Sequence, residues 1–209
     1  MHIDPTLAQA LHSQRDGAIQ SQSSDNAARI VAFSKVGKSP LLVTSGTSTL
    51  TASVEATAGG GLRLRYVFSG PLALVKLPDD SAPTRADGLW QHTCCEAFVA
   101  VPGEATYREF NFSPSGAWAA YRFSDYRSTA ALPLGPVPTI ACQSSADRLL
   151  LDVMLDAAWL PREPALSIGL CAVVETTDGE RSYWSLAHPA PQPNFHHREG
   201  FALRLTRRP

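Results

Sequence analysis

Gly88-Leu-Trp-Gln-His-Thr-Cys-Cys-Glu-Ala-Phe98 and Tyr107-Arg-Glu-Phe-Asn-Phe-Ser-Pro-Ser-Gly116 carry the clearest fold signal in this chain. Side chains in the second stretch alternate in character with a period of two, which is typical of a β-strand whose two faces meet different surroundings. The same parity places Glu96 and Phe98 on one face of the preceding strand. Only residues 102–105 separate the predicted strands 93–101 and 106–113, so we expect the two strands to pair antiparallel. This pairing can place Glu96 on the same face as a row of hydrogen-bonding side chains, namely Tyr107, Glu109, Asn111 and Ser113.

Similar alternation recurs along the chain from residue 41, with turn signals such as Asp178-Gly179 between the runs. About eleven strands at this spacing are typical of a two-sheet sandwich. We therefore predict an all-β fold, a two-sheet antiparallel β-sandwich. The predicted strands are 49–56, 61–69, 72–77, 93–101, 106–113, 117–123, 137–143, 148–155, 165–175, 181–188 and 201–206.

The same alternation predicts the residues of the core. Segments 49–56 and 61–69 flank Gly59-Gly60-Gly61 and form a hairpin candidate. Large apolar side chains that share one face of a predicted strand should pack between the sheets. These are Leu62, Leu64, Tyr66 and Phe68 on the hairpin, Phe110 and Phe112 on strand 106–113, and Trp118 or Tyr121 on strand 117–123.

Composition indicates one globular domain. The 209 residues are 44% hydrophobic and 18% charged, which is enough apolar material for a core and too little charge for disorder. Lys and Arg number 18 against 19 Asp and Glu, and no basic cluster interleaved with aromatics occurs, so nucleic acid is not an expected partner.

We expect residues 1–38 to form a partly helical or loose arm, because Leu7, Ala10 and Leu11 have helical spacing. Residues 39–209 should form the sandwich. One short helical turn is expected at 156–160.

Targeting and metal signals are weak. No apolar run has the length of a signal peptide or a membrane helix, so the expected location is cytoplasmic, with no membrane partner. The four cysteines form no C-x-x-C pair, and neither a metal nor a cofactor is expected. The oligomeric state stays open.

The polar row suggests a sugar-binding face. Saccharide hydroxyls pair with carboxylates and amides, and their C–H faces stack on aromatic rings. Glu96, Asn111 and Ser113 supply the polar groups, and Trp90, just before its strand, can supply the ring. The alternative is that these polar residues lie on a solvated sheet face while Trp90 caps the core.

The chain resembles stand-alone bacterial DOMON-like proteins, which are related to the family 9 carbohydrate-binding modules. The resemblance is carried by Leu89-Trp-Gln-His-Thr-Cys-Cys-Glu-Ala-Phe98, by Tyr107 to Trp118, by Tyr183-Trp-Ser-Leu-Ala-His-Pro189 and by Asn194-Phe-His-His197. It spans roughly residues 41–206 and implies a non-catalytic module that binds a small saccharide.

The resemblance also implies site roles. It puts Trp90 and Phe195 in the aromatic roles, Glu96 in the carboxylate role, and Asn111 and Ser113 in the polar roles, with Glu109 and Asn194 as further ligand-binding candidates. The family 9 modules usually have Arg and Asn in place of Asn111 and Ser113, and Trp in place of Phe195.

Two other functions stay open. DOMON relatives include haem-binding electron-transfer domains, whose iron takes His or Met ligands. We expect Met154 to pack in its apolar strand and the His196-His197 pair to lie in a polar loop, with side chains that diverge. The other alternative is a glycoside hydrolase that uses Glu96 and Glu109, because diagonal neighbours on paired strands lie at a suitable separation for two catalytic carboxyl groups.

Overall fold

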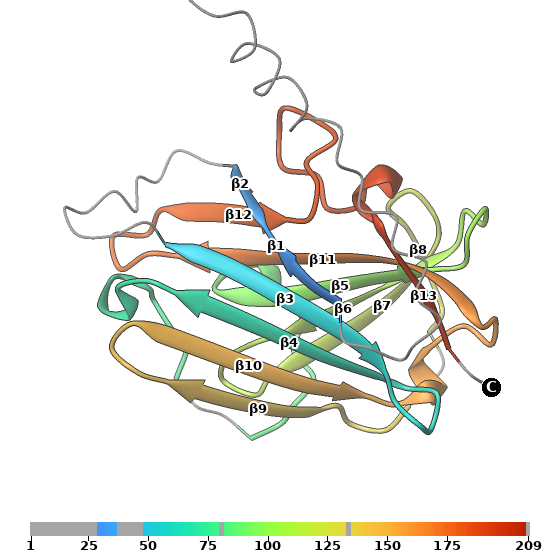
Figure 1. The fold of residues 1–209 in the computed structure, drawn as a ribbon, viewed down its shortest axis with the longest axis horizontal. Coiled ribbons are helices and arrows are strands. Elements are labelled where there is room, and N and C mark those ends of the chain that lie inside the picture. Colours follow the sequence, from blue (N-terminus) through green and yellow to red (C-terminus); the bar gives the residue numbers. More distant parts are fainter. Residues whose placement is uncertain (1–28, 37–47, 80–81, 133–134, 208–209) are drawn as a thin grey trace, which may run out of the picture.

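Two antiparallel sheets lie face to face in the computed structural model, which describes residues 29–36, 48–79, 82–132 and 135–207 (Figure 1). The five-stranded sheet has the order β1 (Arg29–Ala32), β3 (Thr49–Ala56), β4 (Leu62–Ser69), β10 (Arg148–Leu155) and β9 (Thr139–Ser144). The eight-stranded sheet has the order β2 (Ser34–Val36), β12 (Arg181–Ser185), β11 (Ala165–Glu175), β5 (Cys94–Ala100), β6 (Tyr107–Phe112), β7 (Trp118–Asp125) and β8 (Ser128–Ala130). Its remaining strand, β13 (Leu203–Thr206), also pairs with β11. The predicted two-sheet β-sandwich is confirmed.

The core between the sheets follows the predicted faces. β3 and β4 form the expected hairpin, and Leu62, Leu64, Tyr66 and Phe68 are at most 4% exposed. From the opposite sheet, Phe110 and Phe112 on β6 are fully buried in the same apolar cluster. Trp118 joins this core, whereas Tyr121 packs against a second cluster on the outer face of the eight-stranded sheet. The period-two pattern therefore assigned these strands to the correct faces.

Several local predictions were wrong. Segment 72–77 was predicted as a strand but contains the 3-10 turn η1 (Leu72–Leu74), and only Val75 forms a bridge, to Thr176. Strand β8 was missed, because three residues are too few to show a period. Part of the predicted arm is strand, since β1 pairs with β3 and β2 with β12. The helical spacing at residues 7–11 lies outside the described residues.

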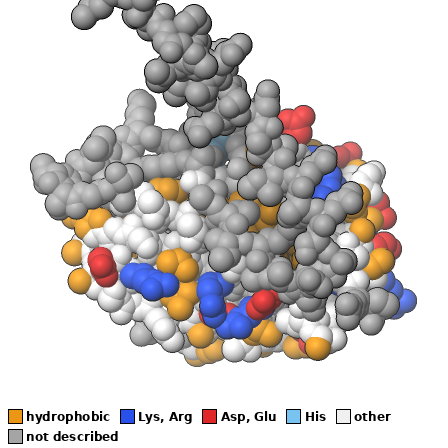
Figure 2. Space-filling model, in the orientation of Figure 1, with side chains coloured by type: hydrophobic (Ala, Val, Ile, Leu, Met, Phe, Trp, Pro, Cys, Tyr) orange, Lys and Arg blue, Asp and Glu red, His pale blue; other side chains and the backbone are white. Residues whose placement is uncertain are grey.

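The outer face of the five-stranded sheet is polar. On this face the guanidinium groups of Arg63 and Arg65 both donate to the carboxylate of Asp152, with Nη2–Oδ2 distances of 2.7 and 2.5 Å. Figure 2 shows basic and acidic side chains next to one another here. Met154 lies on the same face and is 42% exposed, so the expectation that it packs in the core was wrong. Leu149, Leu151, Val153 and Leu155 take the inward positions of β10 instead.

Short turns connect the strands. The predicted helical turn is present as η3 (Ala157–Trp159), where the Asp156 carboxylate accepts the Ala158 N–H. Another 3-10 turn, η2 (Leu89–Gln91), precedes β5, and η4 (Arg198–Gly200) precedes β13. In the described part of the chain, no helix is long and apolar enough to cross a membrane.

Both faces of the eight-stranded sheet are covered. Its inner face forms the core between the sheets, and its outer face carries a second apolar cluster that includes Phe98, Tyr107, Phe123 and Phe201. Tyr107 and Phe123 stack with ring centroids 4.8 Å apart. Tyr121 and Phe195 pack against this second cluster from the strand and the loop that they belong to.

Candidate functional site

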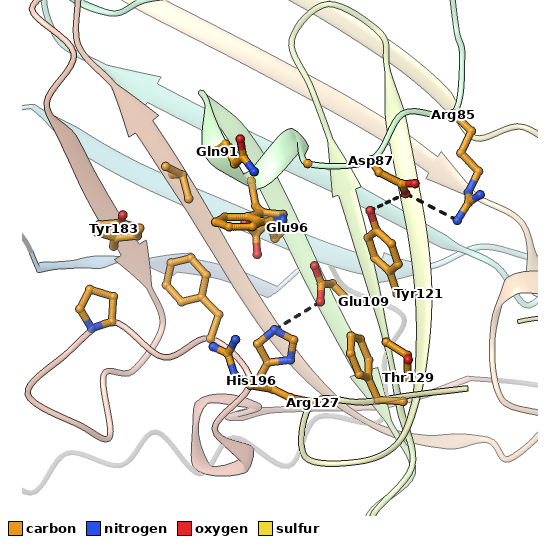
Figure 3. A pocket seen from close by; sticks show the side chains of 16 residues that line it. Arg85, Asp87, Gln91, Glu96, Glu109, Tyr121, Arg127, Thr129, Tyr183 and His196 are labelled. Atoms are coloured by element: carbon orange, nitrogen blue, oxygen red, sulfur yellow. Dashed lines mark hydrogen bonds and ion pairs between the residues drawn. The ribbon is translucent and has the colours of Figure 1, made fainter. Parts of the chain in front are cut away.

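A cavity of about 860 Å³ lies over the outer face of the eight-stranded sheet (Figure 3). Strands β5, β6, β7 and β11 form its floor, with Glu96, Glu109, Phe123 and Val173 among the floor residues. Its walls come from segments that lie far apart in the sequence, which are residues 85–91, residues 127–129, and residues 193–196. A volume of this size accommodates a small organic ligand.

Two buried carboxyl groups lie on the floor. Glu96 on β5 is directly opposite Asn111 on β6, and Glu109 is opposite Phe98, so the two glutamates are diagonal neighbours on one face. Glu96 is 3% exposed and Glu109 is 5% exposed. Burial raises the pKa of Glu96 well above its usual range, and the nearby charge of Glu109 raises it further. The pair resists losing both protons.

Glu109 is held from two sides. The Asn111 side chain is fully buried and donates from Nδ2 to Oε1 of Glu109 at 2.9 Å. On the other side, Nε2 of His196 lies 3.5 Å from Oε2 of Glu109. Burial raises the pKa of Glu109, while the Asn111 hydrogen bond and the positive charge of Arg127 oppose this rise. Glu109 is thus the better stabilised carboxylate of the pair.

A short chain of hydrogen bonds orients His196. The backbone N–H of Arg127 donates to the Tyr107 hydroxyl oxygen at 3.0 Å, and the same hydroxyl lies 2.9 Å from Nδ1 of His196. Since the Tyr107 oxygen already accepts a hydrogen bond from the Arg127 N–H, its own O–H is available to donate to Nδ1, which leaves Nε2–H facing Glu109. Burial, with a contribution from the charge of Arg127, lowers the pKa of His196 to about 4, so this ring is neutral near pH 7.

Trp90 stands on the wall of the cavity and is 50% exposed. The turn η2 that carries it begins after Gly88, whose φ of 78° lies in the left-handed region that glycine adopts without strain. Across the sheet, Phe195 packs edge-on against Tyr183, with ring centroids 6.1 Å apart. Both aromatic residues line the cavity, as the sequence predicted for residues in the aromatic roles.

The remaining wall is polar. The Tyr121 hydroxyl donates to Asp87 at 2.8 Å, and a guanidinium nitrogen of Arg85 lies 3.8 Å from the same carboxylate oxygen. The carboxylate of Asp87 is therefore already paired. Arg127 is the other cation in the lining, and Nε of this residue donates to the Tyr126 hydroxyl at 3.3 Å.

The structure brings together four of the seven sequence-predicted site residues. Trp90, Glu96, Glu109 and Phe195 line the cavity, and Asn111, Ser113 and Asn194 are not among its lining residues. Asn111 lies beneath it and holds Glu109. Ser113 belongs to the β6–β7 turn, where its oxygen accepts the Ser115 N–H, and Asn194 donates to the Tyr126 hydroxyl at 3.1 Å.

Sequence reasoning missed much of the wall. His196 was expected in a polar loop, yet it is part of the site and contacts the rings of Phe98 and Phe123 at centroid distances of 5.2 and 5.1 Å. Its neighbour His197 points elsewhere and caps η4, so the predicted divergence of the two side chains is confirmed. Tyr121, Arg127 and Asp87 were missed because nothing in their local pattern relates them to Glu96.

Met154 and His196 are not placed to hold one haem iron between them. Met154 lies on the outer face of the five-stranded sheet, whereas His196 lies over the outer face of the other sheet. Both ring nitrogens of His196 also face protein partners. Among the described residues, no group of three or more His, Cys, Asp or Glu side chains is arranged to hold a metal ion.

Comparison with known proteins identifies the fold. No family model and none of the curated proteins matches the chain. A candidate carbohydrate-binding protein from Bacteroides uniformis is similar in structure, with a TM-score of 0.56 and 13% identity over 82% of this chain and 83% of that chain. A family 9 carbohydrate-binding module from Caldicellulosiruptor kristjanssonii, in complex with glucose, has a TM-score of 0.51 and 7% identity over 78% of each chain. The protein thus has a β-sandwich fold like that of family 9 carbohydrate-binding modules.

Proposed function

We propose that the cavity over the eight-stranded sheet binds a small saccharide without cleaving it. The observation that carries this proposal is the meeting of a half-exposed Trp90 ring with the buried carboxyl groups of Glu96 and Glu109 in one cavity of about 860 Å³. A sugar ring offers an apolar face for stacking and hydroxyl groups for the polar floor. The bound sugar of the Caldicellulosiruptor module supports the same ligand class.

The motif at residues 89–98 supports a place for the chain among DOMON-like proteins. In this proposal η2 supplies the stacking ring and β5 supplies the acid, because the motif contains both Trp90 and Glu96. Asn111 acts through Glu109, since its amide orients that carboxyl group from below the cavity. The loop residue Phe195 provides the second apolar surface.

Calorimetric titration with a panel of neutral and charged monosaccharides and disaccharides tests the proposal. At least one sugar should bind, and Trp90→Ala should weaken that binding at least about tenfold through lost stacking. Met154→Ala is the matched control, because it removes an exposed apolar side chain from the opposite sheet. Equal binding by the Trp90→Ala protein would contradict the assignment of this ring to the site.

A glycoside hydrolase is the second candidate. It is favoured by the two buried carboxyl groups, whose pKa values are both raised by burial, since an elevated pKa suits a general acid. Chromogenic aryl glycosides provide the assay. Turnover that is lost in both Glu96→Gln and Glu109→Gln proteins would favour this activity over binding alone.

A further inference from the structure

Two buried oxygen atoms, one at the floor of the cavity and one just beneath it, lack a hydrogen-bond donor among the described residues. Oε1 of Glu96 and Oδ1 of Asn111 are both buried, and neither has a hydrogen-bond partner within the part of the chain that the structure describes. The two residues are direct partners across β5 and β6. Buried acceptors without a donor are unfavourable, and in native proteins they are usually satisfied by water, an ion or a ligand.

The cavity also lacks one positive charge. Its lining contains two guanidinium groups, Arg85 and Arg127, against three carboxyl groups, Asp87, Glu96 and Glu109. Arg85 is paired with Asp87, and Arg127 favours the charged form of Glu109. Glu96 is the carboxyl group left without a cation.

The other titratable groups that face Glu96 do not provide this charge. His196, from the loop, is neutral near pH 7, because burial lowers its pKa to about 4. Cys171 lies opposite Glu96 on β11, and burial raises the pKa of its thiol well above the usual value. Cys94, on the same face of β5 as Glu96, is likewise a buried thiol with a raised pKa. Without a ligand, the Glu96 and Glu109 pair therefore retains a proton.

We propose that the preferred ligand is an amino sugar, whose ammonium group binds against the Glu96 carboxylate. This inference rests on the proposed saccharide site and names the class of saccharide. An ammonium group offers three donors and one positive charge, which are the two things that the floor lacks. Trp90, Phe195 and Tyr183 add aromatic surface along the lining, which also attracts cations. A neutral sugar supplies no such charge, so the carboxyl pair keeps its proton when a neutral sugar binds.

A matched ligand series tests the inference. Calorimetric titrations at about pH 6 would compare glucose, galactose and mannose with their 2-amino, 3-amino and 6-amino derivatives and with the corresponding N-acetyl sugars. Amines of this kind are charged at that pH, and acetylation keeps the nitrogen while removing the charge. At least one amino sugar should bind about tenfold or more tightly than both its parent and its N-acetyl form. Its binding should also release a proton from the carboxyl pair, seen as a buffer-dependent enthalpy.

Two variants assign the preference to the floor. Glu96→Gln should lose the preference for the amino sugar, whereas Glu104→Gln should keep it. This control makes the same chemical replacement, Glu to Gln, at a residue that is exposed and lies outside the cavity. Circular dichroism checks the fold, and Glu109→Gln, which should also lose the preference, replaces Glu96→Gln if that protein does not fold.

The outcomes separate the two proposals. If neutral or N-acetyl sugars bind as tightly as every amino sugar, the amino-sugar inference is overturned and the saccharide site stands. If the preference survives in Glu96→Gln, the placement of the ammonium group is overturned. If no sugar of any kind binds, the saccharide site and the inference are both overturned.

Discussion

Replacing Phe110 with alanine should strongly destabilise the sandwich. The side chain is fully buried between the sheets, stacked 6.5 Å from Phe112 and edge-on 6.3 Å from Trp159, measured between ring centroids. Loss of the buried apolar surface costs about 2 kcal/mol. The space left behind adds a similar amount where neighbours cannot collapse into it, so the total should be about 3 to 5 kcal/mol.

Urea unfolding followed by tryptophan fluorescence and circular dichroism measures this difference, provided that the two signals change together. Phe195→Ala is the matched control, because this Phe lines an open cavity rather than the core. It should cost less than about 1 kcal/mol while impairing ligand binding. A Phe110→Ala protein as stable as the wild type would show that the inner and outer faces of β6 had been assigned the wrong way round.

Three further predictions concern charge and backbone. The hydrogen bond from Arg63, with a smaller contribution from Arg65, lowers the pKa of Asp152 to about 2. The stability of the wild-type protein should therefore fall by about 1 kcal/mol as the pH drops from about 4 to 2. In acid unfolding experiments the Asp152→Asn protein should lack this loss. His196 has a pKa lowered from 6.5 to about 4, so the unfolded chain takes up its proton first, and stability should fall by about 2 kcal/mol as the pH drops through that interval. In thermal melts across the same interval, His196→Gln should show a shallower dependence on pH. Gly88→Ala should cost about 1 to 2 kcal/mol, because its φ is 78°, and should weaken sugar binding in calorimetry by displacing Trp90.

The strands with a strong period were predictable from sequence. β10 and β11 occupy the predicted segments 148–155 and 165–175, because long runs of alternating or continuous apolar residues leave few other structures. Edge strands are harder. β2 and β8 have three residues each, which is too few to show a period, and β2 also depends on a partner far along the chain, β12. Segment 72–77 shows the opposite error, since an apolar run there forms a turn and a single bridge.

The site was only partly predictable for a related reason. Glu96 and Glu109 could be placed on one face because a short link fixes the pairing of β5 and β6. The walls arise from tertiary folding, which brings residues 127–129 and 193–196 over that face. Arg127 illustrates the limit, because it combines a left-handed backbone, with φ of 54°, and a backbone hydrogen bond to Tyr107. No local sequence pattern predicts either feature for arginine.

β6 separates stability from ligand chemistry within one strand. Its inward residues, Phe110 and Phe112, need only apolar volume that fits the opposing sheet, and many sequences meet that condition. Its outward residues, Glu109 and Asn111, are polar and are linked by a specific hydrogen bond. Proteins that share this fold at 13% identity are therefore expected to keep the apolar pattern of the inner face. Differences in their outer residues and in the three wall segments are expected to change which ligand binds. For this chain, the unmatched carboxyl group of Glu96 is the outer feature from which we infer a ligand other than a neutral sugar.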